Sequence, residues 1–524
     1  MMHGLLFSIL LVATHSGQLS GVTVDREVTV YKGVPYAAPP VGELRWKAPE
    51  PVAPWQGVRA ATEFGPACVQ PKSTGVSVYT DDPPHMSEDC LYLNIWQPTK
   101  VKSGAPVMVW IHGGAFRSGH TASQIYDGTE LARRGVVIVS TSYRLGILGF
   151  LAHPQLSAES PQHVSGNYGL LDQIAALKWV KENIAAFGGD PANVTIFGES
   201  AGALSVMDLV ASPQARGLFS KAIAESGYMV SNTELRKSRY GLPSAEDIGV
   251  ATAKALGASS IAELRKRAAV DLTETSSKGG YVPLPVVDGW LLPDQLVDIY
   301  DRGEQNHVPM LVGFNAGELR SLRVLLPPIP ASAAEYEKQV RERFKDLSAA
   351  YLKQYPSTDV PDSVLAASRD GLYGWTAQRL AAKQAAIGQP SYLYFFTHSY
   401  PAEVDLQAFH ASEIPFVFGQ IGPKVKLPGT WPRPPDTDEE RALSNAMMDY
   451  WTSFARTGVP AANWKPYAQG ESYMELGAKP VPAAHLLPGM YALTEELISR
   501  RRRAPDQFWF TNIGLATPPT KVPQ

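Results

Sequence analysis

The chain has 524 residues, of which 44% are hydrophobic and 19% are charged, with a formal net charge of -3. This is the composition of a globular protein with a large core, and the small net charge indicates neither nucleic acid nor an anionic membrane as a partner. No apolar run approaches the roughly 20 residues that span a bilayer, so no transmembrane segment is expected.

The N-terminal residues allow two interpretations. Residues 5–13 are apolar, so we expect residues 1–13 to be an atypical or truncated signal segment. The alternative places them in the first strand, because residues 14–21 already read as strand and turn. Residues 14–524 are then expected to form a single domain.

Two cysteines, Cys68 and Cys90, follow in the next part of the chain. The pair supplies too few ligands for a structural metal site, so no metal is expected. If oxidised, the two would close a loop of about 20 residues and stabilise the fold by roughly 3 kcal/mol. The residues themselves leave a disulfide and two reduced, buried thiols equally open.

Five short apolar runs, rich in β-branched and aromatic residues, predict strands that are buried on both faces of a sheet. They are residues 107–111, 136–141, 194–197, 308–314 and 392–396. A helical pattern over residues 170–187 lies between the second and third runs and ends at a glycine pair. This succession predicts an α/β fold with a large, mostly parallel central sheet flanked by helices.

A polar, helical stretch lies between the last two of these strands, over about residues 325–390. Its pattern is typical of surface helices rather than of strands buried in a sheet. We expect it to form a helical cap or lid insertion within the same domain.

The segment Gly198–Gly202 reads G-E-S-A-G and connects the strand at 194–197 to a helical run at 203–210. This is the G-x-S-x-G motif in the context that exposes a nucleophilic serine at a sharp strand-to-helix turn. The flanking glycines remove the Cβ atoms that would clash in such a turn. The motif therefore predicts Ser200 as a catalytic nucleophile rather than a solvated turn serine.

A second glycine-rich turn, His112–Phe116, follows the strand at 107–111. Acyl transfer builds negative charge on the substrate oxygen, and backbone N–H groups aimed at that oxygen stabilise it by about 3 kcal/mol each. We expect an oxyanion hole made by the N–H groups of Gly114, Ala115 and Ala201. The alternative is a tight turn that only ends a strand.

With these motifs in place, the chain resembles the type-B carboxylesterase/lipase family, the cholinesterase-like group, and within it the bacterial type of carboxylesterase. The similar segments are Phe187–Gly202 (FGGDPANVTIFGESAG), Glu88–Ile95 (EDCLYLNI), Lys32–Gly42 (KGVPYAAPPVG) and Gly166–Gln173 (GNYGLLDQ). The resemblance covers nearly the whole chain and implies the α/β-hydrolase fold and the hydrolysis of carboxylic esters.

The resemblance also implies the two partners of the serine. Gly313–Glu318 is similar to the family's acid segment, and Phe409–Gly419 is similar to its histidine segment, which points to Glu318 and His410. Family members usually carry Asp before this Glu and Gly after it. Here the neighbours are Gly317 and Leu319, so a different local loop is expected. The rival acids are Asp288 and Asp294.

Further roles follow from the resemblance alone. Glu199 is expected as a buried carboxylate beside the nucleophile, with Ser226 close to it. Arg45 with Glu88, and Arg144 with Asp172, resemble the family's structural ion pairs. Cys68 and Cys90 occupy the positions of the family's first disulfide. A disulfide and a leader favour a secreted or periplasmic protein, with the cytoplasm as the alternative.

The substrate is less well defined. Phe116 and Tyr281 are similar in position to residues that line the family's pocket, while Gly279 and Gly280 leave space beside Tyr281. Cholinesterases of this family carry a tryptophan in the loop that corresponds to residues 70–87, where it binds the cationic head. This chain has no tryptophan there, which argues against choline esters. We expect a small-molecule ester as substrate, broad specificity and no cofactor. The alternatives are an amidase and a non-catalytic binding or adhesion protein of the same fold, and the sequence says nothing of oligomeric state.

Overall fold

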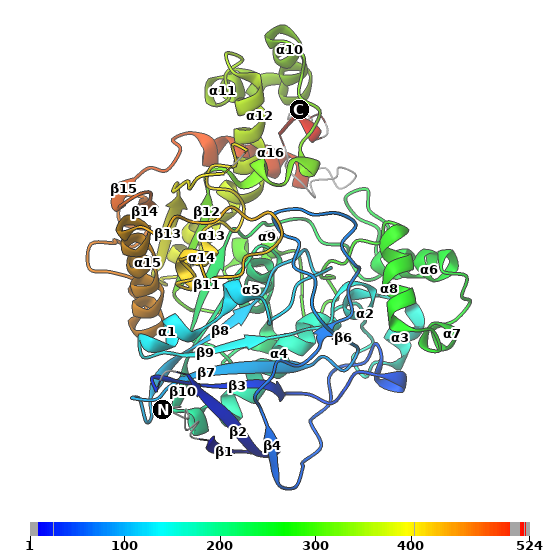
Figure 1. Ribbon diagram of the computed structural model, residues 1–524. Helices are drawn as coiled ribbons and strands as arrows, with labels where there is room; N and C mark the ends of the chain where they lie inside the picture. The colour runs from blue at the N-terminus through cyan, green and yellow to red at the C-terminus, as the bar shows by residue number, and fades with distance from the viewer. Residues whose placement is uncertain (1–8, 25, 403, 504–513, 518, 520–524) are drawn as a thin grey trace.

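The computed structural model describes residues 9–24, 26–402, 404–503, 514–517 and 519, and its centre is a twisted sheet with helices against both faces (Figure 1). The strands of this sheet are β1 (Ile9–Thr14), β2 (Gly17–Val24), β3 (Val28–Pro35), β4 (Val58–Ala60), β7 (Tyr92–Pro98), β8 (Ala105–Ile111), β9 (Val137–Thr141), β10 (Gly189–Glu199), β11 (Lys221–Glu225), β12 (Met310–Asn315), β13 (Ser391–Phe396), β14 (Ser472–Leu476) and β15 (Pro480–Ala484). Two further strands, β5 (Ala67–Cys68) and β6 (Met86–Ser87), pair with each other.

The sheet is parallel in its central part and antiparallel at its edges, apart from the short β4, which pairs in parallel with β2. Its strand order is β1-β2-β3-β7-β9-β8-β10-β11-β12-β13-β14-β15, and every neighbouring pair from β9 to β14 is parallel. All five strands predicted from apolar runs are present, as β8, β9, β10, β12 and β13. The predicted α/β class with a large, mostly parallel sheet is therefore confirmed.

The central strands are buried on both faces because their side chains alternate between two cores. In β8, Val107 and Val109 belong to one hydrophobic cluster, and Met108 and Trp110 belong to the other. The first cluster is closed by α4 (Tyr168–Asn183), α5 (Ala201–Ala211), α9 (Leu296–Arg302) and α13 (Trp375–Ala386). The second is closed by α1 (Thr129–Arg133), α14 (Ile414–Val417) and α15 (Asp438–Thr457).

The remaining helices lie away from the middle of the sheet. Figure 1 shows α6 (Ala245–Ala255), α7 (Ile261–Arg265) and α8 (Ala269–Lys278) together on one side of the molecule, close to α2 (Gly146–Phe150) and α3 (Pro154–Glu159). The helices α10 (Ala333–Phe344), α11 (Ser348–Gln354), α12 (Val360–Arg369) and α16 (Met490–Arg502) gather at another end.

The predicted helical stretch at 325–390 therefore contains two kinds of helix. The helices α10, α11 and α12 share a hydrophobic cluster of their own with α16, whereas α13 packs against the central sheet. A role as a cap or lid stays a prediction.

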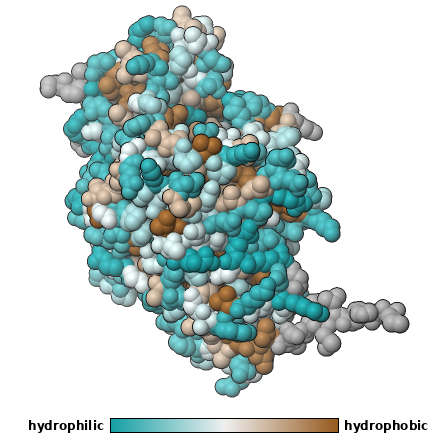
Figure 2. Space-filling model, turned by 90° about the vertical axis from the view of Figure 1, so that its left-hand side faces the viewer, coloured by the Kyte–Doolittle hydropathy of each residue, from teal (hydrophilic) through white to brown (hydrophobic). Residues whose placement is uncertain are grey.

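The N-terminal segment enters the sheet. Residues 9–14 form the edge strand β1, antiparallel to β2, which agrees with the alternative interpretation for those residues. Residues 1–8 of the expected signal segment lie outside the described residues. Within the part of the chain that the structure describes, no helix is long and apolar enough to cross a membrane. The face seen in Figure 2 is largely hydrophilic, with small, separate hydrophobic areas.

Candidate active site

Ser200 stands at a strained turn between β10 and α5. Its backbone adopts φ 57° and ψ −122°, a conformation that non-glycine residues rarely populate and that marks functional sites. The turn is tight, since a Cβ added at Gly202 would lie 2.0 Å from the carbonyl oxygen of Ile111 on β8. The glycines of the G-x-S-x-G motif are therefore needed for the close packing of α5 on the sheet.

The glycine turn after β8 lies directly against the serine. A Cβ added at Gly113 would meet the Ser200 Cβ at 3.1 Å, so the backbone here passes close to the nucleophile. Gly114 and Ala115 both have positive φ angles, 101° and 55°. Among the described residues, no hydrogen bond uses the backbone N–H of Gly114, Ala115 or Ala201. Three free donors thus flank the serine.

His410 and Glu318 are joined by a short hydrogen bond, 2.5 Å between His410 Nδ1 and Glu318 Oε2. Glu318 is fully buried, and its other carboxylate oxygen accepts the N–H of Asn315 at 2.8 Å. The two loops are held together by the N–H of Gly317, which donates to the carbonyl of Ala408 at 2.7 Å. The carboxylate therefore fixes which nitrogen of the imidazole faces the cavity.

The other imidazole nitrogen, His410 Nε2, lies 3.0 Å from Glu199 Oε1. Within the described residues, no hydrogen bond joins Ser200 to His410. Tyr373 packs at 5.2 Å from the imidazole centroid, and the Tyr79 hydroxyl donates to the His410 carbonyl at 2.9 Å. The ring is held from three sides, with Nε2 beside the residue that precedes the serine.

Buried carboxylates surround this histidine. Burial and the nearby charges of Glu318 and Glu225 hold the pKa of Glu199 well above its ordinary value. Burial and the charge of Glu199 do the same to the pKa of Glu413, and burial raises the pKa of Glu225 to about 8. These shifts weaken the negative charge that the carboxyl groups carry around the histidine.

Ser226 is fully buried at the end of β11, with a positive φ of 51°. Its backbone N–H donates to Gly313 on β12 at 2.9 Å, while its hydroxyl has no partner among the described residues. Ser226 thus fixes the end of β11 beside the buried carboxyl groups.

A cavity of about 520 Å³ lies at the nucleophile and the histidine. Its wall includes Gly114, Ala115, Ser200 and His410, together with Glu199. Most of the remaining wall is aromatic or aliphatic, and the aromatic part consists of Tyr79, Tyr126, Tyr228, Tyr373 and Trp431. The structure therefore brings the predicted nucleophile, histidine and free amides to one apolar cavity.

The two predicted pocket residues lie elsewhere. Phe116 is fully buried and packs against Phe150, with 4.9 Å between ring centroids, so it does not line this cavity. Tyr281 donates its hydroxyl hydrogen to the carbonyl of Phe150 at 2.7 Å and lines a neighbouring cavity. Neither residue is therefore part of the wall of the cavity at Ser200.

The rival acids have structural contacts. Asp288 accepts the backbone N–H groups of Trp290 and Leu291 and so holds a turn. Asp294 pairs with Arg302 at 3.0 Å near the surface. Of the three candidate acids, only Glu318 has a hydrogen bond to His410 among the described residues.

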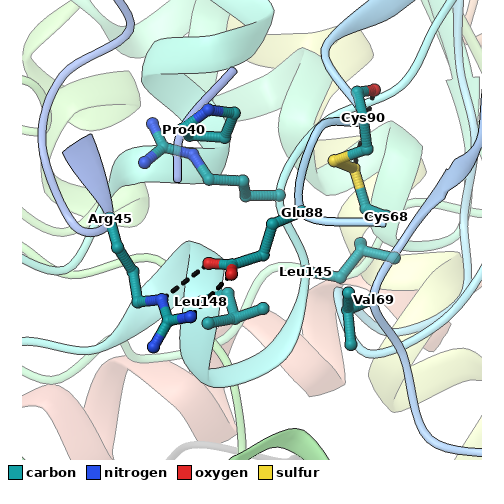
Figure 3. A pocket seen from close by; sticks show the side chains of 9 residues that line it. Pro40, Arg45, Cys68, Val69, Glu88, Cys90, Leu145 and Leu148 are labelled. Carbon is teal, nitrogen blue, oxygen red and sulfur yellow. Dashed lines mark hydrogen bonds and ion pairs between the residues drawn. A yellow bond between two sulfur atoms is a disulfide. The ribbon is translucent and has the colours of Figure 1, made fainter. Parts of the chain in front are cut away.

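The expected structural contacts near the N-terminus are present. Figure 3 shows the disulfide between Cys68 and Cys90 and the two-pronged ion pair of Arg45 with Glu88, whose closest N–O distance is 2.6 Å. Arg144 and Asp172 form a second, buried pair at 2.7 Å. The predicted disulfide is confirmed.

Several residues of the site were not predicted. Glu225 and Glu413 are buried around the histidine, and Tyr373 and Trp431 line the cavity. Glu413 had one signal in the sequence, since it is a lone acid three residues after His410 in an apolar run. Of the two aromatics, Tyr373 is in the helical segment Asp370–Gly374 and Trp431 is in a loop, and neither had such a signal. Among the described residues, no group of His, Cys, Asp and Glu is arranged to hold a metal ion.

Comparison with known proteins gives the family. Residues 9–492 match the model of the carboxylesterase family. The chain is 39% identical to fumonisin B1 esterase of Sphingopyxis macrogoltabida over 89% of this chain and 86% of that protein. It is 37% identical to para-nitrobenzyl esterase of Bacillus subtilis (strain 168), over 87% and 92% of the two chains.

Solved structures agree with these relatives. A PNB esterase structure superposes with a TM-score of 0.80 at 33% identity, covering 93% of this chain and 99% of that one. A thermophilic PNB esterase gives a TM-score of 0.78 at 34% identity. The chain therefore belongs to the carboxylesterase family and is a carboxylic ester hydrolase with the α/β-hydrolase fold.

Proposed function

We propose that Ser200, His410 and Glu318 form the catalytic triad, with Ser200 as the nucleophile that carries the acyl group. The observation that carries this proposal is the 2.5 Å bond from His410 Nδ1 to the buried Glu318, since His410 lines the same cavity as the strained serine. His410 Nε2 takes the serine proton during attack and returns it to the leaving alkoxide. Glu318 stabilises the imidazolium that forms.

Glu199 has a separate role in this proposal. It lies 3.0 Å from His410 Nε2, and burial together with the nearby charges of Glu318 and Glu225 raises its pKa well above the ordinary value. A raised pKa weakens the negative charge beside Nε2, so Glu199 attracts the imidazolium less than a fully ionised carboxylate would. The serine then reaches Nε2 when substrate closes the site, since such hydrogen bonds often tighten only in the complex.

The N–H groups of Gly114, Ala115 and Ala201 form the oxyanion hole in this proposal. All three belong to segments at the carboxyl ends of β8 and β10, and Ala201 opens α5, where the helix dipole favours negative charge. Because their N–H groups have no partner among the described residues, stabilising the oxyanion displaces no protein hydrogen bond.

We propose uncharged esters with apolar acyl or alcohol groups as substrates. The charged side chains Asp81, Asp82 and Arg117, which line the cavity, have polar partners: Asp81 lies 3.6 Å from His120, Asp82 accepts the Ser73 hydroxyl at 2.6 Å, and Arg117 donates to the Ser277 hydroxyl. Apolar residues extend to the rim, where Val324 is 91% exposed. The relatives named for fumonisin B1 and para-nitrobenzyl esters agree with broad specificity.

The experiment that tests this proposal compares p-nitrophenyl butyrate with the matching p-nitroanilide. An esterase cleaves the ester far faster, whereas an amidase cleaves both at comparable rates. Turnover of neither would favour a non-catalytic binding protein. Activity that survives exhaustive chelation is expected, because the proposed mechanism uses side chains and backbone amides only.

We also propose that the protein is secreted or periplasmic. The disulfide between Cys68 and Cys90 persists best in an oxidising compartment. Fractionation of the source cells, with thiol labelling before and after reduction, tests this. Free Cys68 and Cys90 in a cytoplasmic fraction would contradict it.

A further inference from the structure

A second cavity, of about 1090 Å³, adjoins the first. It lies at the side of the molecule where Figure 1 shows α6 and α8, and residues of the segment 281–286 are part of its lining. Val282 and Leu284 line both cavities. The two spaces therefore share one thin wall, made by a few residues of a single segment.

The helices that border this cavity present small side chains to it. On α6, Ala251 and Ala255 are one helical turn apart and both are exposed. On the opposite side, Thr275 of α8 and the following Gly279 line the space. Facing helices normally bury larger side chains against each other, so this packing leaves room that the protein does not fill.

The cavity has few charges, and these are already paired. Asp247 accepts the Ser244 hydroxyl at 2.7 Å, and Lys278 lies 3.6 Å from Glu274 with its side chain 75% exposed at the edge. The other lining residues are uncharged and mostly apolar. This lining suits an unbranched hydrocarbon chain and offers no inward-facing partner to a charged ligand.

The shared wall is anchored at its two ends. The Tyr281 hydroxyl is held by Phe150, and the backbone N–H of Val286 donates to Asn167 Oδ1 at 2.8 Å. Between them Val282 is 65% exposed, and the preceding Gly280 has φ 81° with no atom within 4 Å of an added Cβ. The Val282 side chain can therefore change its rotamer without moving the anchors.

We infer that the second cavity binds the distal part of a long acyl or alkyl chain whose ester carbonyl lies at Ser200. This inference rests on the proposed esterase function and specifies its substrate class. The first cavity has the usual volume for a small ligand, and a chain that extends beyond it meets the second cavity at Val282 and Leu284, which line both.

The test measures kcat/KM for p-nitrophenyl acetate, octanoate and laurate, and for dodecyl acetate, in the wild type and in Ala251→Trp and Ala255→Trp. The indole is expected to occupy the part of the cavity next to α6. Each methylene denied burial is worth about fourfold, so laurate hydrolysis is expected to fall at least roughly tenfold. Acetate hydrolysis is expected to change by less than about twofold.

Val250→Trp is the matched control. Val250 is on the same helix and 45% exposed, but it does not line the cavity. It is expected to leave the preference for long chains unchanged. Loss with p-nitrophenyl laurate places the acyl chain in the cavity, and loss with dodecyl acetate places the alcohol chain there.

Equal laurate rates in Ala255→Trp and Val250→Trp would overturn the inference, while continued acetate hydrolysis would leave the esterase function intact. If the Trp variants do not fold, Ala255→Leu and Val250→Leu repeat the comparison with a smaller added side chain. If the wild type does not hydrolyse acetate, the proposed function itself fails.

Discussion

The backbone N–H of Ser200 donates to the carbonyl oxygen of Glu225 at 3.0 Å, across from β10 to β11. One residue after Glu225, the backbone N–H of Ser226 donates in the same way to the carbonyl oxygen of Gly313 on β12. The loop after β12 then carries Glu318 to His410. Backbone hydrogen bonds between successive strand ends thus connect the nucleophile to the acid, so the sheet itself positions the site.

Replacement of Gly202 by alanine is expected to damage this arrangement. The new Cβ would lie 2.0 Å from the Ile111 carbonyl, so α5 must move away from the sheet. We expect a loss of about 2 kcal/mol or more in the free energy of unfolding, together with turnover. Gly75→Ala is the control, since its Cβ meets nothing within 4 Å. Equal thermal unfolding of the two variants would contradict the packing described here.

Glu318→Gln is expected to lower kcat by roughly 10³–10⁴. Both carboxylate oxygens accept hydrogen bonds, from His410 Nδ1 and from the N–H of Asn315, and an amide cannot accept both. The imidazole then takes the wrong tautomer or loses its partner. Asp294→Asn alters a rival acid at the surface and is expected to leave kcat unchanged. If Asp294→Asn lowered kcat and Glu318→Gln did not, Asp294 rather than Glu318 would be the catalytic acid.

Glu225→Gln is expected to change how stability depends on pH. Burial raises the pKa of Glu225 to about 8, so the folded protein keeps a proton that the unfolded chain loses near pH 4.5. The stability that this group contributes is complete below about pH 4.5 and is lost as pH rises through about 8, by at most about 1.4 kcal/mol per pH unit. Denaturant titrations from pH 5 to 9 should show a shallower decline in the variant than in the wild type. Parallel curves would show that Glu225 does not titrate in this range.

Removal of the disulfide by Cys68→Ala with Cys90→Ala is expected to lower the free energy of unfolding by about 3 kcal/mol. The bond closes a loop with a sequence separation of 22, and opening it enlarges the unfolded ensemble. Wild type in reductant should unfold like the double variant. If reductant leaves the wild type as stable as before, the bond contributes little.

Much of the fold could be predicted from local patterns in the sequence. The runs that form β8, β9, β10, β12 and β13 are apolar because both faces of these strands are covered, and such burial is visible in a single sequence. Ser200 was predictable for a similar reason, since its glycines, strand and helix are contiguous. The first strand was harder, because an apolar edge strand and a leader share one composition.

The partners of the serine could not be predicted from spacing. Glu318 and His410 lie 92 residues apart in sequence and meet only because β12 and β13 are neighbours. Only the resemblance to a family pointed to them. Phe116 and Tyr281 show the limit of that approach, since positions similar to pocket residues are here turned toward Phe150. The carboxyl group of Glu225 accepts a hydrogen bond from the indole N–H of Trp451 on α15, an element far from β11 in sequence.

The most direct measurement of the central claim is covalent labelling by a p-nitrophenyl phosphonate ester, followed by peptide mapping. The account predicts one phosphonyl group per chain, on Ser200, with loss of turnover in proportion to labelling and neither labelling nor turnover in Ser200→Ala. Stoichiometric labelling of a different serine, or a Ser200→Ala variant that still turns over ester, would contradict it.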